Sequence, residues 1–315
     1  MHFGRGALDD AAAALGTGFT LLTTERAQAM APQLAAVAAV AAATHAVAPG
    51  RVDEIAGALV DAVDPGELIV ALGGGRVIDV AKAIAAAREP GSRPRVAAIP
   101  TTLSAAEMTA THRRAAGADG SLPGVRPAIV VNDPALSASQ PDAALAASAA
   151  NALGHAAEGP ATTRASPVPA LAGREAARRI AAAYATGDGA PDRDELALGA
   201  LLSGYAIDGC GYGLHHVLSQ TLARFGGVAH GAANAAMLPH TLRALERRGA
   251  PGAGDLVGLA TDLAGRAQTV RLRDLGVDAA VLDACADAAS GRAELDLIPP
   301  RPDREELREL YESAF

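Results

Sequence analysis

The stretch Gly73-Gly-Gly-Arg-Val-Ile-Asp79-Val-Ala-Lys82 directly follows the apolar run Glu67-Leu-Ile-Val-Ala71 and decides the fold. The run is typical of a buried strand, and the glycines predict a tight turn into a helix that begins near Arg76. Glycine has no Cβ, so the backbone can approach a pyrophosphate closely, and the first turn of a helix offers unpaired N–H groups to it. A tight turn from strand to helix would also explain the glycines, so the triplet alone leaves both interpretations open.

Outward from this stretch, short β-branched runs alternate with alanine-rich helical segments. The predicted strands are Phe19–Thr23, Glu67–Ala71, Arg95–Ile99 and Ala128–Asn132. We expect helices over 51–63 and 76–88, and a weaker strand within 36–47. This alternation is typical of a parallel sheet that is covered by helices.

The alternation stops after Asp133-Pro134, and the rest of the sequence shows helical patterns without convincing strands. Turns rich in Pro and Gly interrupt these patterns at 160–169, 186–192 and 249–254. Pro299-Pro-Arg-Pro302 predicts a rigid turn, and Asp303 predicts the N-cap of a closing helix. We therefore predict a nucleotide-binding α/β domain over residues 1–136 and an all-helical domain over 137–315.

The composition narrows the possible functions. Of the 315 residues, 50% are hydrophobic and 20% are charged, which excludes extended disorder. The net charge is −8 and aromatic residues make up 3%, so the chain lacks the basic clusters and stacking surfaces that nucleic acid requires. Cys210 and Cys285 are too few for a disulfide framework or a structural zinc site, which favours a reducing compartment. With no recognisable signal peptide or membrane span, we expect a soluble cytoplasmic protein without a membrane partner.

Hydroxyl groups mark two further positions at the carboxyl ends of predicted strands, where open α/β sheets bind their ligands. Thr101 and Thr102 follow the strand that ends at Ile99. Thr24, at the end of the first strand, stands where NAD enzymes place an acidic residue on the ribose, which leaves both NAD and NADP possible. Arg26 next to it could favour the 2′-phosphate of NADP, or it could be a solvated surface residue.

The helical half contains five of the eight histidines. Asn151 and His155 are four residues apart in a helical pattern, so they share one face. The segment between His216 and His230 contains Gly226-Gly227 and could fold both histidines back toward one point. For each histidine alone, a core or surface residue without chemistry is the alternative interpretation.

Taken together, these motifs resemble the iron-containing alcohol dehydrogenase superfamily. Gly73–Lys82 is similar to its GGGSxxDxAK signature, and Ala98-Ile-Pro-Thr-Thr-Leu-Ser-Ala-Ala-Glu-Met-Thr109 is most similar to the maleylacetate reductase branch. Four further stretches are similar to the same branch: Phe3–Leu8, Asp133–Leu136, Gly213–His216 and the closing Pro300–Phe315. The resemblance spans the whole chain. It implies a dehydroquinate synthase-like architecture, with a Rossmann-like α/β N-terminal domain, an all-helical C-terminal domain and a cleft between them.

The resemblance also implies a cofactor and its binding residues. Superfamily members use a nicotinamide cofactor, NAD(P)H, and are often homodimers. The cofactor-binding positions implied here, with those predicted above, are Gly73, Gly74, Gly75, Asp79, Thr101, Thr102 and Thr24. Arg76 replaces the signature serine and could either pair with a phosphate or face solvent.

In the helical half, the resemblance implies a catalytic and metal-binding set. Asn151 and His155 match the Asp-A-x-x-His ligand pair of the superfamily, and His216 and His230 match its other two metal ligands. The neutral Asn151 replaces an anionic ligand, so we expect iron or zinc to be bound poorly by the three histidines. A protonated histidine or an ordered donor would then have to stabilise charge on the substrate oxygen. Gln220 stands where a proton-transferring histidine is expected, and glutamine is neither an acid nor a base near neutral pH.

The leading hypothesis is therefore a nicotinamide-dependent reductase of a small carboxylated oxo or unsaturated compound, similar to maleylacetate reductase. Arg113 or Arg114 could hold the substrate carboxylate, with a charged surface loop as the alternative. The substitutions at Gln220 and Arg76 motivate a second hypothesis, a non-redox lyase or cyclase of a specialised biosynthetic pathway on the same scaffold. A catalytically silent binding protein is the third. Nucleotide binding and NAD(P)H consumption discriminate among the three.

Overall fold

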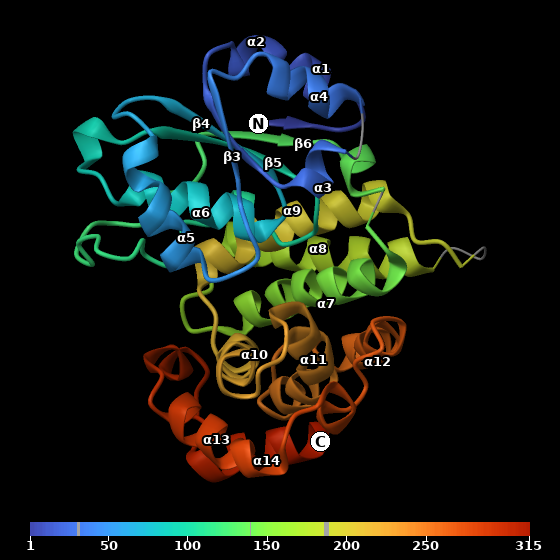
Figure 1. The fold of residues 1–315 in the computed structure, drawn as a ribbon. Coiled ribbons are helices and arrows are strands. Elements are labelled where there is room, and N and C mark those ends of the chain that lie inside the picture. Colours follow the sequence, from blue (N-terminus) through green and yellow to red (C-terminus); the bar gives the residue numbers. More distant parts are fainter. Residues whose placement is uncertain (30–31, 139, 186–188) are drawn as a thin grey trace. The chain divides into compact units, whose positions relative to one another are not determined.

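The computed structural model describes residues 1–29, 32–138, 140–185 and 189–315 of the chain. The chain divides into two compact units, Met1–Gln140 and Pro141–Phe315, which run from blue to green and from green to red in Figure 1. Each unit has its own architecture.

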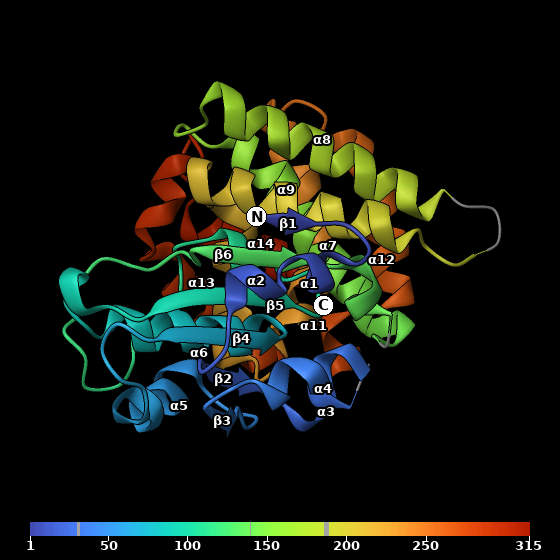
Figure 2. The same ribbon diagram turned by 90° about the horizontal axis from the view of Figure 1, so that it is seen from above.

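The first unit contains a six-stranded parallel sheet with the order β1-β6-β5-β4-β2-β3 (Figure 2). Its strands are β1 (His2–Phe3), β2 (Thr20–Thr23), β3 (Ala43–Ala46), β4 (Leu68–Gly73), β5 (Arg95–Pro100) and β6 (Ile129–Asn132). The predicted parallel sheet is confirmed, including the weak strand within 36–47. The sequence did not indicate β1, because two residues are too short to show a hydrophobic period.

Alternate side chains of the central strands enter two separate cores, one on each face of the sheet. Ile69 and Ala71 of β4 pack with residues of α5 and α6, whereas Val70 and Leu72 pack with residues of α1, α2 and α4. The helices of this unit are α1 (Ala7–Asp10), α2 (Ala12–Leu15), α3 (Glu25–Gln28), α4 (Pro32–Ala39), α5 (Val52–Leu59) and α6 (Gly75–Ala86). Burial on both faces explains why the strands read as continuous apolar runs.

The second unit is helical, and its described residues, 141–185 and 189–315, contain no strand. Its helices are α7 (Asp142–Glu158), α8 (Pro167–Tyr184), α9 (Arg193–Cys210), α10 (Leu214–Phe225), α11 (His230–Arg247), α12 (Val257–Arg266), α13 (Leu282–Ser290) and α14 (Arg304–Ala314). Helix α7 packs against α8, α9, α11 and α12. The residues of α7 are therefore surrounded by protein over most of the helix.

Two predicted boundaries in this unit have different outcomes. The side chain of Asp303 accepts a hydrogen bond from Glu306 N–H, so the predicted N-cap of α14 is confirmed. The predicted turn at 160–169 is too long, because α8 already begins at Pro167; proline is favoured at the first position of a helix. Of the predicted turn at 186–192, residues 186–188 lie outside the described residues.

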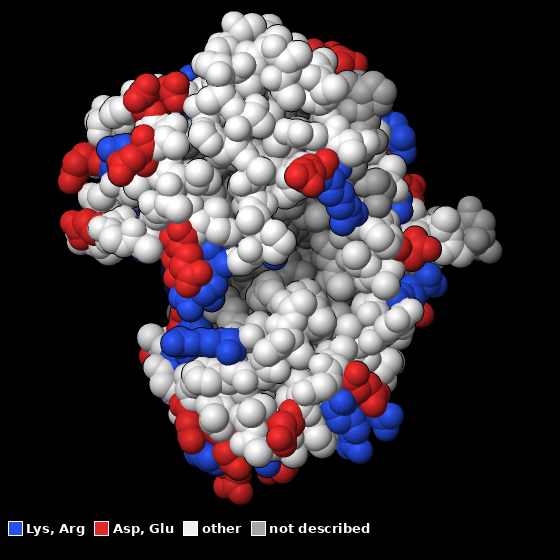
Figure 3. Space-filling view, viewed as in Figure 1, with Lys and Arg blue, Asp and Glu red and all other residues white. Residues whose placement is uncertain are grey.

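The surface and the thiols agree with the composition. On the face drawn in Figure 3, acidic and basic side chains are interspersed rather than gathered into a broad basic patch. Cys210 and Cys285 are buried free thiols. Within the described ranges, none of the helices is long and apolar enough to cross a membrane.

Candidate functional site

The glycine turn lies between β4 and α6, as predicted. Gly73 ends the strand, Gly74 is the N-cap and Gly75 is the first residue of the helix, and no side chain caps this helix start. A Cβ on Gly74 would lie 3.1 Å from Cγ2 of Thr102, and one on Gly75 would lie 2.8 Å from Cβ of Ser104. A turn this closely packed has no space for side chains. It presents backbone N–H groups to the sheet edge, which fits an anionic pyrophosphate.

The predicted threonines lie next to this turn. Thr101 N–H donates to the carbonyl of Gly73 at 3.0 Å, so the ends of β4 and β5 are joined there. Thr101 is buried, Thr102 is half-buried and Arg76 is exposed. The structure therefore brings the glycines and both threonines to one edge of the sheet.

Asp79 and Lys82 form an ion pair, and the half-buried Asp79 keeps its predicted cofactor contact as a prediction. Lys82 is fully buried, and its Nζ donates to Asp79 Oδ1 at 2.9 Å. It also donates to Ala106 O at 3.0 Å, Thr109 Oγ1 at 3.2 Å and Thr111 O at 2.9 Å. A buried ammonium needs such partners. Lys82 thereby fixes the segment after β5 against α6, a role that the sequence motif did not reveal.

We expected Thr24 at the end of the first strand, and it lies one residue after that strand. Strand β2 ends at Thr23, and Thr24 is the N-cap of α3, where its Oγ1 accepts a hydrogen bond from Ala27 N–H at 3.1 Å. Threonine is a favoured N-cap, which explains the residue without a ligand. The hydroxyl oxygen thus already serves the helix, and its predicted contact with a ribose stays a prediction.

Arg113 and Arg114 lie on the loop that follows η3 (Ala106–Met108). Arg113 is exposed and Arg114 is half-buried. Nη1 of Arg114 is buried and has no hydrogen-bond partner among the described residues. The predicted contact of Arg113 or Arg114 with a substrate carboxylate stays a prediction.

A buried carboxyl group that the sequence did not indicate lies in η3. Glu107 is 1% exposed; its Oε1 accepts a hydrogen bond from Asn132 Nδ2 at 3.4 Å, and its Oε2 has no partner among the described residues. Burial raises the pKa of Glu107 to about 7, because the ionised form loses its hydration. This side chain therefore gains or loses its proton near neutral pH.

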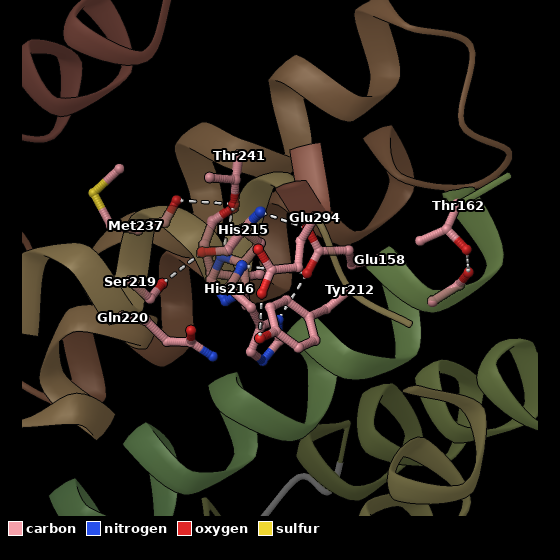
Figure 4. Close-up of polar contacts among 12 residues, drawn as sticks. Glu158, Thr162, Tyr212, His215, His216, Ser219, Gln220, Met237, Thr241 and Glu294 are labelled. Carbon is pink, nitrogen blue, oxygen red and sulfur yellow. Dashed lines mark hydrogen bonds and ion pairs between the residues drawn. The ribbon is translucent and has the colours of Figure 1, made fainter. Parts of the chain in front are cut away.

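In the second unit, α7 and α10 bring three histidines together, of which His215 and His216 are labelled in Figure 4. The rings of His155 and His216 are stacked, with centroids 4.5 Å apart and planes 16° apart. His215 meets the edge of His216 at 4.9 Å. A Cβ on Gly154 would lie 2.6 Å from the His215 ring, so glycine is required where α10 approaches α7. Asn151, one turn before His155 on α7, is buried at the same site.

Glu158 holds this cluster together. Its fully buried carboxylate accepts hydrogen bonds from His215 N–H at 2.5 Å, His216 N–H at 3.2 Å and His216 Nδ1 at 2.7 Å. The first two bonds cap α10, whose N-cap residue is Gly213, and place negative charge at the positive end of the helix. The third bond puts the ring proton of His216 on Nδ1. The buried Nε2 of His216, which has no partner among the residues that the structure describes, can then accept a hydrogen bond or bind a ligand.

The other two histidines of the cluster are held in their neutral form. Burial lowers the pKa of His155 well below 6.5, and the nearby His216, His215 and His230 imidazoles lower it further. Burial also lowers the pKa of His215 well below 6.5, and its Nδ1 contacts Thr241 Oγ1 at 2.9 Å. His230 is the first residue of α11 and is exposed. Near neutral pH, His155 and His215 therefore supply no positive charge.

A tightly bound divalent metal ion needs several ligand atoms that converge on one point. Within the described part of the chain, no group of three His, Cys, Asp or Glu side chains is placed to hold a metal. His155 and His216 turn ring faces toward each other, whereas two imidazole ligands of one ion aim their nitrogens at it. Asn151 adds only a neutral oxygen. The residues as placed do not fit a tightly bound divalent ion.

Gln220 belongs to a second polar group beside the histidines. Its Oε1 accepts a hydrogen bond at 3.0 Å from Nη2 of Arg292, which forms an ion pair with Glu294 at 2.7 Å. The Tyr212 hydroxyl donates to Glu294 at 3.0 Å, and its ring centroid lies 5.8 Å from that of His216. Gln220 is thus held by residues that the sequence did not single out.

Glu158 and Arg292 were not predicted from the sequence, and they differ in whether a local sequence pattern could have indicated them. Glu158 is three residues after His155 on the same helix face, and an acidic residue in an alanine-rich helix was a usable signal. Arg292 is 72 residues from Gln220 along the chain. No local pattern connects them, so only the tertiary structure reveals this contact.

Two family models match the chain, one in each unit. The family model of iron-containing alcohol dehydrogenase matches residues 1–134, and that of the C-terminal part of the Fe-containing alcohol dehydrogenase family matches residues 145–257. Maleylacetate reductase of Burkholderia cepacia is 30% identical over 241 residues, covering 70% of this chain and 67% of that protein. The crystal structure of maleylacetate reductase from Agrobacterium tumefaciens superposes with a TM-score of 0.82 at 27% identity, over 99% of this chain and 95% of that one.

Another relative matches over a shorter stretch. The 1,3-propanediol dehydrogenase of Klebsiella pneumoniae is 36% identical over 121 residues. This match covers 37% of the chain and 31% of the length of that relative.

Proposed function

Since the chain belongs to the iron-containing alcohol dehydrogenase family, we propose that it is an NAD(P)H-dependent reductase of a small carboxylated oxo or unsaturated compound, similar to maleylacetate reductase. The uncapped glycine turn at the start of α6 is the observation that carries the proposal. The likeness to maleylacetate reductases over most of the chain supports the substrate class.

The first unit would bind the cofactor. Backbone N–H groups at Gly75 and Arg76, together with the positive end of α6, would hold the pyrophosphate. The Thr102 hydroxyl, which lies beside Gly74, can donate to a phosphate oxygen. When bound, the reduced nicotinamide supplies hydride. Both NADH and NADPH are compatible with this turn.

The second unit would hold the reacting part of the substrate. Nε2 of His216, the ring nitrogen opposite the Nδ1 that contacts Glu158, can accept a proton from a substrate or water. Stacking of His155 on His216 fixes the ring and excludes water from one of its faces. Gln220 provides a neutral polar contact one helical turn further along α10.

Calorimetric titration with the four nicotinamide nucleotides, followed by NAD(P)H oxidation assays with maleylacetate, tests the proposal. We expect at least one nucleotide to bind with Kd well below about 1 mM, which corresponds to ~4 kcal/mol. Absence of binding in all four titrations would contradict a reductase. Binding without NAD(P)H oxidation would instead favour a lyase or cyclase. A homodimer is also proposed by analogy, and light scattering measures it.

A further inference from the structure

We propose that Gln220, oriented by Arg292, donates a hydrogen bond to the oxo oxygen of the substrate and cannot accept one there. Gln220 thereby determines whether the enzyme reduces an alkene or a carbonyl group. Arg292 is its positioning residue. This inference rests on the proposed reductase function and assigns a role to two residues of the second unit.

The orientation of the Gln220 amide follows from the chemistry of its partner. A guanidinium group has N–H donors and no acceptor. The atom of Gln220 that lies 3.0 Å from Nη2 of Arg292 must therefore be the carbonyl oxygen. The amide nitrogen then lies on the side away from the guanidinium. It donates one hydrogen bond to the Tyr212 hydroxyl, and its remaining proton can be donated to a ligand.

Arg292 is itself held in place, so the amide cannot turn easily. Its Nε and Nη2 donate to the two carboxylate oxygens of Glu294 at 3.0 and 2.7 Å, and Nη2 also lies 3.2 Å from the Tyr212 hydroxyl oxygen. Such a two-point contact fixes the plane of the guanidinium. The Arg292 hydrogen bonds also lower the pKa of Glu294 to about 2, so this carboxylate stays ionised.

The donor lies beside the histidine cluster. Gln220 is four residues after His216 on α10, so the two side chains share one face of the helix (Figure 4). The Tyr212 ring, whose hydroxyl contacts Arg292, is 5.8 Å from the His216 ring. A substrate oxygen on this face can therefore meet the remaining amide proton of Gln220 while the neighbouring carbons lie near His216.

A fixed donor without acid strength suits one reaction better than the other. Hydride addition to a carbonyl carbon breaks the C=O π bond and leaves an alkoxide, which needs a proton that Gln220 cannot supply. In a conjugated enone, hydride forms a C–H bond at the distal alkene carbon, and the π electrons move to the oxygen as an enolate. A hydrogen bond stabilises this delocalised charge, and water later protonates the carbon next to the carbonyl. The nicotinamide is oxidised, and a saturated ketone is formed.

A matched pair of substrates tests this role: trans-4-oxopent-2-enoate has an alkene and a carbonyl, and 4-oxopentanoate has only the carbonyl. We expect the wild type to convert the first into the second and to reduce the second at least about 100-fold less efficiently, because carbonyl reduction needs a proton that Gln220 cannot supply and a general acid contributes about 100-fold or more. Gln220→Glu keeps the acceptor for Arg292 but loses the donor, so alkene reduction should fall about 100-fold in kcat. Gln220→His supplies an acid and should increase carbonyl reduction at least about tenfold.

The positioning role of Arg292 is tested with the ratio of two reaction rates, which general destabilisation of the protein would leave unchanged. Arg292→Met frees the amide to rotate, so the ratio of alkene to carbonyl reduction should fall about tenfold, and Arg292→Lys should restore part of it. Arg271→Met is the matched control, because it removes an exposed ion pair with Asp274 and should leave the ratio unchanged. Thermal melting and circular dichroism of each variant establish that it is folded.

Binding without turnover separates this inference from the proposed function. With NAD(P)+ present, calorimetry should show that 4-oxopentanoate binds the wild type at least about tenfold more tightly than Gln220→Glu, since that variant lacks the donor. Equal affinities, an unchanged alkene rate in Gln220→Glu, or no binding to the wild type would overturn the role of Gln220. A wild type that binds 4-oxopentanoate through Gln220 but oxidises no NAD(P)H would contradict the reductase instead.

Discussion

The glycine turn of the first unit and the histidine cluster of the second are built by opposite means. The turn is made by backbone: glycines pack against Thr102 and Ser104, and the start of α6 carries no capping side chain. The cluster is made by side chains, with the buried carboxylate of Glu158 at its centre. A ligand site can thus arise from missing side chains or from side chains that hold one another. Only the site that arises from missing side chains is formed by consecutive residues, so only this site is visible as a sequence motif.

Among the described residues, each unit also buries one glutamate, Glu107 in the first and Glu158 in the second. These two glutamates differ in how many hydrogen bonds they accept. Glu158 accepts three hydrogen bonds, two of them from backbone N–H groups. Glu107 accepts one long bond from Asn132, and its other oxygen has no partner among the described residues. Burial alone therefore does not show that a carboxylate stabilises the fold. The number and kind of its donors decide this.

The largest expected effect concerns the backbone site. Gly74→Val places a branched side chain where a Cβ alone would lie 3.1 Å from Thr102, so the turn can no longer approach a pyrophosphate. We expect nucleotide binding to weaken at least about 1000-fold, or ~4 kcal/mol, in a variant that circular dichroism shows to be folded. Calorimetry with NADH and NADPH measures it. Gly91→Val, where a Cβ would meet open space, is the control and should bind as the wild type does.

The side-chain site should instead respond through stability. Glu158→Ala leaves two backbone N–H groups and one imidazole N–H buried without partners, so the free energy of unfolding should fall by about 3 kcal/mol. Urea denaturation measures this loss. Glu158→Gln keeps one carbonyl oxygen as an acceptor and should lose clearly less. Equal stability of the alanine variant and the wild type would show that the cluster is not held by Glu158.

These two sites also mark how far the sequence alone leads. The strand and helix periods, with Gly73–Gly75, predicted the parallel sheet and the turn, because each depends on neighbouring residues. For the cluster, the resemblance led to His155 and His216, and their ring contact is a tertiary fact. Arg292 could not be predicted, because nothing in its local sequence distinguishes it from the other arginines. At Thr24, the sequence predicted a contact with a ribose but not the N-cap that the structure shows, and the predicted contact stays a prediction.

The difference between the two glutamates predicts that Glu107 makes the free energy of unfolding depend on pH. Because burial raises its pKa to about 7 from 4.5, the native state binds a proton that the unfolded chain releases between these pH values. The free energy of unfolding should therefore fall as pH rises from 4.5 to about 7, by up to about 3 kcal/mol. Urea denaturation of Glu107→Gln should lack this decline, so the variant should exceed the wild type in stability at pH 8 and match it at pH 4.5. Parallel pH curves for the two proteins would contradict the assignment.

The smallest expected effect tests whether the cluster can become a metal site. Asn151 offers a neutral oxygen beside His155, so a divalent ion gains no Coulomb attraction there while the full cost of its dehydration remains. Asn151→Asp adds the missing charge and should raise Zn²⁺ affinity at least about tenfold, or ~1.4 kcal/mol, in competition with a chromogenic chelator. Gln28→Glu adds the same charge in the first unit and should leave Zn²⁺ affinity unchanged. No gain in Asn151→Asp would mean that the histidines do not converge on a common ion. Wild-type protein that retains stoichiometric iron or zinc, and loses activity in EDTA, would show that the neutral residue already suffices.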